Sequence, residues 1–155
     1  MIRLSRLADY GLVLMGRMAG DAGSVHTALS LAEETQLPMP TVAKLLVRLA
    51  QGGLLISHRG AKGGYELARA ASTITVADIV VTVDGPIALT QCLEHGADPC
   101  DVERICPTRR GWNRLNDAVR RALADVSLAE LIQPAPFAAP PSPMRTTSES
   151  PQSPP

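Results

Sequence analysis

The chain holds three cysteines, Cys92, Cys100 and Cys106, and all of them fall within residues 92–106. Short polar segments separate them, so this stretch can bend and gather the three thiolates around one small centre. Closely spaced thiolates are ligands of soft metal centres, and both zinc and an iron–sulfur cluster are compatible with them. The alternative is three incidental cysteines in a surface loop, but their clustering in an otherwise cysteine-free chain argues against it.

The rest of the composition indicates an intracellular, mostly helical protein. Of 155 residues only 3% are aromatic, which predicts an aliphatic core of the kind that helices build. An odd number of cysteines argues against a secreted disulfide framework. We find neither an apolar run long enough to cross a membrane nor the pattern of a signal peptide, so we expect a cytoplasmic protein with no membrane partner.

Charge is divided unevenly although the net charge is zero. Residues 1–70 carry eight basic and five acidic residues, a balance of +3, whereas residues 71–132 have a balance of −3. A mildly basic first half permits a polyanionic partner for that half only.

The first fifty residues predict three helices. Apolar spacing indicates a first helix over residues 5–19, and Thr27 is a suitable N-cap for a second. Pro38 ends the second helix, and Pro40 suits the first turn of a third, which Gly52 and Gly53 terminate. The third helix has an apolar face formed by Val42, Leu45, Leu46 and Leu49. Two short helices joined by a tight turn are typical of a helix-turn-helix, with any packed helix pair as the alternative.

A basic hairpin follows directly. Residues 54–58 and 65–67 predict two strands, and the turn between them is rich in glycine and carries two cations. A helix-turn-helix followed by such a hairpin is the winged-helix arrangement, in which the third helix enters the major groove of double-stranded DNA. We expect Thr41 and Lys44 to lie nearest the bases and Arg48 to meet phosphate. The wing residues expected to contact DNA are Arg59, Lys62 and Gly63. The alternative is a solvated helix face and loop.

The second half predicts a further helix capped by Thr75 and ended by Asp84-Gly85-Pro86. Beyond the cysteines, a nearly heptad-spaced seam requires either the N-terminal domain or a second copy of the chain, and we favour a homodimer. The seam consists of Trp112, Leu115, Val119, Ala122 and Val126. Residues 127–130 form a capping-box pattern that begins a last short helix.

These patterns predict a mainly α fold with a small β-hairpin, namely a winged helix-turn-helix plus a long C-terminal dimerisation helix. We expect a DNA-binding domain over residues 1–70 and a cysteine loop with dimerisation helices over residues 71–132. Residues 133–155, rich in proline and serine, predict a disordered tail.

In this order, the elements resemble the bacterial winged-helix regulators that sense iron–sulfur clusters, the IscR/NsrR-like proteins. The resemblance covers residues 1 to about 132. Its distinctive pieces are Leu37-Pro38, Lys44-Leu45-Leu46, the wing at residues 59–65, Asp84-Gly85-Pro86 and the three cysteines. Within that family the chain looks most like the regulator of the SUF cluster-assembly operon.

The resemblance implies that the three cysteines ligate one [2Fe–2S] or [4Fe–4S] cluster, and that a homodimer binds a pseudo-palindromic operator. One branch of the family supplies a histidine where this chain has Arg109, and a protonated guanidinium cannot be a normal ligand. Another branch uses an aspartate of the N-terminal helix, which makes Asp9 from the opposite subunit the leading fourth ligand. Nearer alternatives are Glu94, His95, Asp98, Asp101 and Glu103.

These observations lead to one functional expectation with two rivals. We expect a repressor-type or activator-type switch in which cluster assembly orders the cysteine loop and resets the angle between two recognition helices. The rivals are a winged-helix regulator with a zinc or thiol-redox site, and a nitric-oxide-sensing repressor of the same family. No catalytic triad, phosphate-cradling loop or pair of catalytic carboxylates stands out, so we expect no enzyme and no small-molecule substrate.

Overall fold

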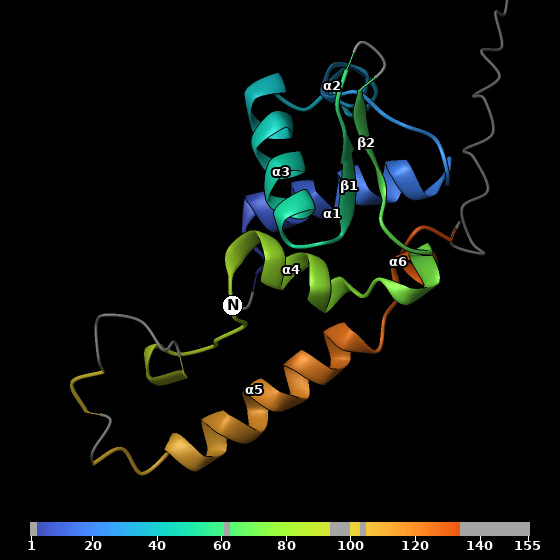
Figure 1. Ribbon diagram of the computed structural model, residues 1–155. Coiled ribbons are helices and arrows are strands. Elements are labelled where there is room, and N and C mark those ends of the chain that lie inside the picture. The colour runs from blue at the N-terminus through green and yellow to red at the C-terminus, as the bar shows by residue number, and fades with distance from the viewer. Residues whose placement is uncertain (1–2, 61–62, 94–99, 103–104, 134–155) are drawn as a thin grey trace, which may run out of the picture.

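The computed structural model describes residues 3–60, 63–93, 100–102 and 105–133, and Figure 1 shows the arrangement of its elements. The helices are α1 (Arg6–Ala19), α2 (Ala28–Thr35), α3 (Met39–Gln51), α4 (Val76–Asp84), α5 (Arg109–Ala124) and α6 (Leu128–Leu131). The strands are β1 (Leu55–His58) and β2 (Gly64–Leu67), and the short 3₁₀ helices are η1 (Ala71–Thr73) and η2 (Gln91–Leu93). This confirms the mainly helical fold with one small hairpin. Apart from Gln133, the predicted disordered tail lies outside the described residues.

The helix-turn-helix forms because its local signals agree with its packing. The Thr27 side chain accepts a hydrogen bond from the amide of Ser30 and caps α2, as predicted. Gln36 adopts a left-handed conformation (φ 57°) after α2, and Pro40 occupies the first turn of α3. The predicted apolar face of α3 is buried against α1 and the other helices, with each of its four residues no more than 1% exposed.

The hairpin also forms as predicted, with one addition. β1 pairs antiparallel with β2, from Leu55 opposite Leu67 to His58 opposite Gly64. His26, which precedes α2, forms a further antiparallel bridge to Tyr65 through two backbone hydrogen bonds of 2.8 Å. A Cβ on Gly64 would lie 2.5 Å from the carbonyl oxygen of His26, so only glycine permits this close approach. The bridge therefore joins β2, near the turn of the hairpin, to the segment that precedes α2.

The second half of the chain folds back onto the same core. Thr75 caps α4 as predicted, and Gly85 ends it with φ 94°. The Ser127 capping box begins α6, whose Leu128 is fully buried, and an isolated bridge joins Thr75 to Ser127. In Figure 1 the C-terminal half of α5 lies beside α4, whereas its N-terminal half extends away from the other helices. Within the described residues, no helix has the length and apolar character needed to cross a membrane.

Candidate nucleic-acid interface and cysteine segment

The surface of α3 opposite its buried face is only partly the one that the sequence suggested. Lys44 is exposed, as expected of a DNA-contacting residue, and it shares this surface with exposed Pro40 and with Val47, which is 45% exposed. Thr41 and Arg48 are seven residues apart and share a flank of the helix that is only partly exposed. Sequence reasoning missed Val47 because an apolar residue in a helix is ordinarily assigned to the core.

Arg48 has a structural partner that the sequence did not reveal. Its Nη1 donates a 2.8 Å hydrogen bond to the backbone carbonyl of Val83, in the last turn of α4. A guanidinium carries five N–H donors, so the expected contact with phosphate uses those that remain. Arg48 thus connects α3 directly to the last turn of α4.

The tip of the wing presents a cation on a constrained backbone. Arg59 is exposed at the end of β1, and Gly60 follows it with φ 107°. The Gly63 amide donates to the carbonyl of Gly60 at 2.9 Å, and a Cβ on Gly63 would lie 2.5 Å from the carbonyl oxygen of His58. Lys62 lies outside the described residues. Across the hairpin, Nε2 of His58 lies 3.0 Å from Oε1 of Glu66.

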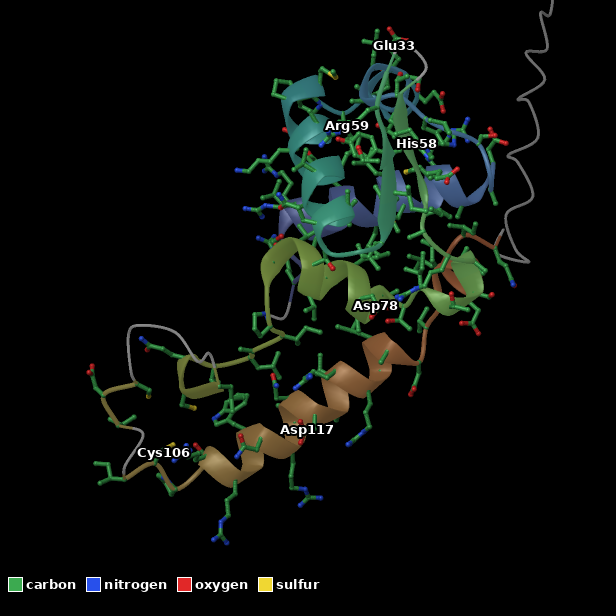
Figure 2. All side chains as sticks on the ribbon, in the orientation of Figure 1. Glu33, His58, Arg59, Asp78, Cys106 and Asp117 are labelled. Carbon is green, nitrogen blue, oxygen red and sulfur yellow. The ribbon has the colours of Figure 1, made fainter. Side chains whose placement is uncertain are left out.

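Charge on this side of the molecule suits a polyanion. α3 contains two cations, Lys44 and Arg48, and no acidic residue. Arg59 adds a third cation from the wing. Figure 2 shows Arg59 and His58 at the hairpin end of the molecule and Cys106 at the opposite end, beyond α4. Cys106 and Arg59 therefore do not contact each other within one chain.

The three cysteines are free and partly exposed. Cys92 lies in η2, and its Sγ is 3.2 Å from the Thr90 hydroxyl. Cys106 precedes α5, and its Sγ is likewise 3.2 Å from the Thr108 hydroxyl. Within the described residues, no three histidine, cysteine or acidic side chains come together as a metal site. Asp9, exposed in the first turn of α1, is therefore not grouped with these cysteines within one chain.

Of the other proposed fourth ligands, only Asp101 is described, and its side chain is exposed. The remaining candidates lie outside the described residues: Glu94, His95, Asp98 and Glu103.

Cys106 has the electrostatic surroundings of a reactive thiol. The hydrogen bond of the Thr108 side chain lowers the pKa of Cys106, and so does the Thr108 backbone amide. The Arg109 amide and the positive charge of Arg109 lower this pKa further. A thiol that precedes a helix N-terminus and lies beside a cation is a better nucleophile and metal ligand, because the thiolate is the reactive form.

A buried asparagine joins the first cysteine segment to α5. Asn116 is 6% exposed; its Nδ2 donates to the carbonyl of Ile87 at 3.0 Å, and its Oδ1 accepts from the amide of Leu89 at 3.1 Å. This two-point contact holds residues 87–89, which lead from α4 to Cys92, against the helix that follows Cys106. The only sequence signal was a polar residue beside the apolar seam of α5.

The seam itself is partly uncovered. Trp112 is 36% exposed and Leu115 is 45% exposed, and together with Thr108 and Gly111 they line a shallow apolar hollow. Further along α5, Leu123 packs against the buried cluster of Ala8, Val76 and Val80. The C-terminal half of the helix therefore packs within the chain, whereas the apolar side chains of Trp112 and Leu115 in its N-terminal half are partly exposed.

Comparison with known proteins agrees with this arrangement. IscR of Photorhabdus laumondii is 32% identical over 133 residues, which cover 84% of this chain and 79% of IscR. CymR of Bacillus subtilis is 34% identical over 132 residues, which cover 84% of this chain and 89% of CymR. Both relatives are transcriptional regulators.

Solved structures show the same fold. CymR, the global cysteine regulator of B. subtilis, superposes with a TM-score of 0.67 at 31% identity, over 85% of this chain and 97% of CymR. IscR of T. potens superposes with a TM-score of 0.64 at 27% identity, over 84% of this chain and 86% of IscR. The Rrf2 model, described as an iron-dependent transcriptional regulator, matches residues 4–134. The chain therefore belongs to the Rrf2 family and is a DNA-binding transcriptional regulator, not an enzyme.

Proposed function

We propose that this regulator senses an iron–sulfur cluster held by Cys92, Cys100 and Cys106, and that it controls cluster-assembly genes of the SUF type in the cytoplasm. The observation that carries the proposal is that all three cysteines lie in the segment that joins α4 to α5. The donors suit such a group, because they are free, accessible thiols, and the pKa of Cys106 is lowered toward the thiolate form. When bound, a [2Fe–2S] or [4Fe–4S] cluster supplies a redox-sensitive link between the thiolates.

The fourth ligand in this proposal is the partner subunit's Asp9. Arg109 cannot serve, because its guanidinium stays protonated. Asp9 is exposed in the first turn of α1, and among the described residues of one chain no three cysteine, histidine or acidic side chains are grouped as a metal site. A ligand from a second chain would make the site complete only in a homodimer.

That homodimer is proposed to form through the uncovered seam of α5, around Trp112 and Leu115. Two copies would present two α3 helices, so the operator is expected to be pseudo-palindromic with half-sites about 34–36 Å apart or a multiple of this spacing. In this proposal residues 1–70 bind DNA, and residues 71–132 sense the cluster and form the dimer.

On the DNA, we propose that Thr41 and Lys44 contact base edges and that Arg48, Arg59 and Lys62 contact phosphates. Gly63 allows close approach of the wing backbone. Lys44→Ala and Lys62→Ala should each weaken operator binding. Each should also flatten the salt dependence of binding, and Lys62→Ala, which removes a proposed phosphate contact, should reduce the slope of log affinity against log salt by about 1. Unchanged affinity in both variants would argue strongly against this mode of docking.

Several hydrogen bonds to residues 83–89, the segment between the end of α4 and Cys92, support coupling between the cysteine segment and α3. Asn116 fixes residues 87–89 to α5, and these residues follow the end of α4 directly. At that end, Asp84 accepts a hydrogen bond from the Ser5 hydroxyl at 2.7 Å, and Val83 accepts from Arg48 of α3. A change in the position of Cys92 relative to Cys106 would therefore alter contacts that hold α3 in place.

A second candidate function uses the thiols themselves. The lowered pKa of Cys106 favours oxidation or zinc binding, and the similar CymR of Staphylococcus aureus has been solved in an oxidized form. Metal analysis distinguishes these alternatives, because zinc is colourless and redox-silent whereas a cluster contributes iron, sulfide and visible absorption.

A nitric-oxide sensor of the same family is a further alternative, and it is tested by exposing an iron-loaded sample to nitric oxide. Loss of the visible absorption together with a change in operator affinity would support it.

A further inference from the structure

The side of α3 that faces away from the core is mostly apolar. We define the outward stripe of α3 as Pro40, Ala43, Lys44 and Val47, which are spaced at i, i+3, i+4 and i+7 and therefore share one side of the helix. Pro40 and Lys44 are exposed, Val47 is 45% exposed and Ala43 is partly exposed. The stripe thus combines one cation with three side chains that cannot form hydrogen bonds.

These apolar side chains do not serve the core. Neither Ala43 nor Val47 belongs to the hydrophobic clusters that the described residues form, whereas Ala50 near the end of the same helix packs against the larger one. Val47 therefore remains in water unless a partner covers it. Of the possible partners, nucleic acid is favoured by charge, because α3 has two cations and no acidic residue and the wing adds Arg59.

The major groove offers a chemically matched surface. Among the bases, only thymine places a methyl group there, and small apolar side chains contact it, whereas lysine donates to O6 and N7 of guanine. We propose that Ala43 and Val47 select thymine through its methyl group, and that Lys44, between them on the stripe, contacts a guanine of the same half-site. The operator half-site would then combine a guanine with neighbouring thymines, and the methyl groups would carry sequence specificity. This inference rests on the proposed docking of α3 in the major groove.

The test replaces single thymines by deoxyuridine, which removes the methyl group and leaves base pairing unchanged. The full-length protein would first select its operator from random duplex DNA, and footprinting would define the half-sites. Each thymine is then replaced in turn, and affinity is measured by fluorescence anisotropy. Burial of one methyl-sized group contributes about 0.8 kcal/mol. Replacement of at least one thymine in each half-site by deoxyuridine should therefore lower the affinity about fourfold.

A double-mutant cycle assigns the contact to Val47. Val47→Ala should weaken binding to the thymine operator and make the variant nearly indifferent to deoxyuridine at the contacted position. Val13→Ala is the matched control, because Val13 is 44% exposed on α1. This control should leave the affinity and the deoxyuridine effect unchanged. Circular dichroism and melting of each variant check that it is folded.

The outcomes separate this inference from the proposed docking. A specific footprint with no deoxyuridine effect at any thymine would overturn methyl recognition while leaving operator binding intact. Equal deoxyuridine effects in the wild type and in Val47→Ala would overturn the assignment to Val47. Failure to select any sequence would count against the specific docking of α3, and with it the inference.

Discussion

At the scale of single residues, Cys106 is the thiol with the most informative surroundings. Because hydrogen bonding by the Thr108 side chain is the largest cause of its lowered pKa, Thr108→Val should raise that pKa and leave less thiolate at neutral pH. We expect alkylation of Cys106 in the cluster-free protein to slow severalfold near pH 7 and its pH midpoint to shift upward. Mass spectrometry of iodoacetamide-treated samples across pH measures this.

Thr90→Val provides the control for that experiment, since the Thr90 hydroxyl lies 3.2 Å from the Sγ of Cys92, the same distance as that between the Thr108 hydroxyl and the Sγ of Cys106. It should leave the Cys106 midpoint unchanged. Identical Cys106 profiles in the wild type and in Thr108→Val would show that the hydroxyl does not set this pKa.

Gly63 makes a steric prediction about the wing. A Cβ there would lie 2.5 Å and 2.9 Å from two backbone carbonyl oxygens, which cannot move as a flexible side chain can. Gly63→Ala should lower the free energy of unfolding by about 1–3 kcal/mol and weaken operator binding, as measured by urea unfolding and anisotropy. Gly111→Ala is the comparison, because apart from its chain neighbours and the backbone of its own helix no described atom lies within 4 Å of its Cβ position, and it should be neutral or stabilising by up to about 1 kcal/mol. Equal stability of the two variants would contradict the steric argument.

Sequence reasoning at this scale succeeded where exposure follows from helical spacing, as it does for Lys44. It could not anticipate the bond between Arg48 and Val83, because a contact between residues 35 positions apart depends on how α3 and α4 pack. For the same reason it assigned Arg48 to the outward surface, whereas the side chain lies on a partly buried flank.

At the scale of elements, Asn116 is proposed to hold the segment before Cys92 in register with α5. Asn116→Ala would leave the carbonyl of Ile87 and the amide of Leu89 without these hydrogen-bond partners. Each of the two groups that stays buried should lower the free energy of unfolding by about 1–3 kcal/mol. We expect a clear loss of unfolding free energy in urea. Asn113→Ala changes an exposed asparagine of the same helix and should stay within about 0.5 kcal/mol of the wild type. A wild-type stability of Asn116→Ala would contradict the positioning role.

Local signals were sufficient to predict the helices and the hairpin. Thr27, Thr75 and Ser127 cap helices where their patterns indicated, and Gly85 ends α4 with a positive φ. The bridge between His26 and Tyr65 was not predictable, since His26 lies in no periodic segment and its pairing depends on the absence of a side chain at Gly64.

At the scale of the whole molecule, the uncovered half of α5 predicts self-association. Leu115→Asp places a charge on the apolar seam and should raise the dimer dissociation constant about tenfold or more, because burial of a leucine contributes about 1.5–3 kcal/mol. Sedimentation velocity across a range of protein concentrations measures this. Asn113→Asp adds the same charge to an exposed position off the seam and should leave association unchanged. If both variants sediment as the wild type does, the seam is not the dimer contact.

Family and architecture could be expected from the order of motifs along the chain, and the Rrf2 match over residues 4–134 confirms them. The arrangement of the three thiols could not be deduced in the same way, because their spacing allows many loop conformations and the completing ligand is proposed to come from another chain. Figure 2 adds that Cys106 and the wing lie at opposite ends of the molecule, so the proposed signal is transmitted between elements and not by direct contact.

The most direct test is to measure iron, acid-labile sulfide and operator affinity on one anaerobically purified sample, before and after removal of iron by a chelator. The cluster proposal predicts visible absorption, iron and sulfide, and an operator affinity that changes about tenfold or more when they are lost. It also predicts that Cys92→Ala, Cys100→Ala and Cys106→Ala each reproduce the iron-free affinity. A colourless, iron-free protein whose DNA binding is the same in all three variants would contradict it.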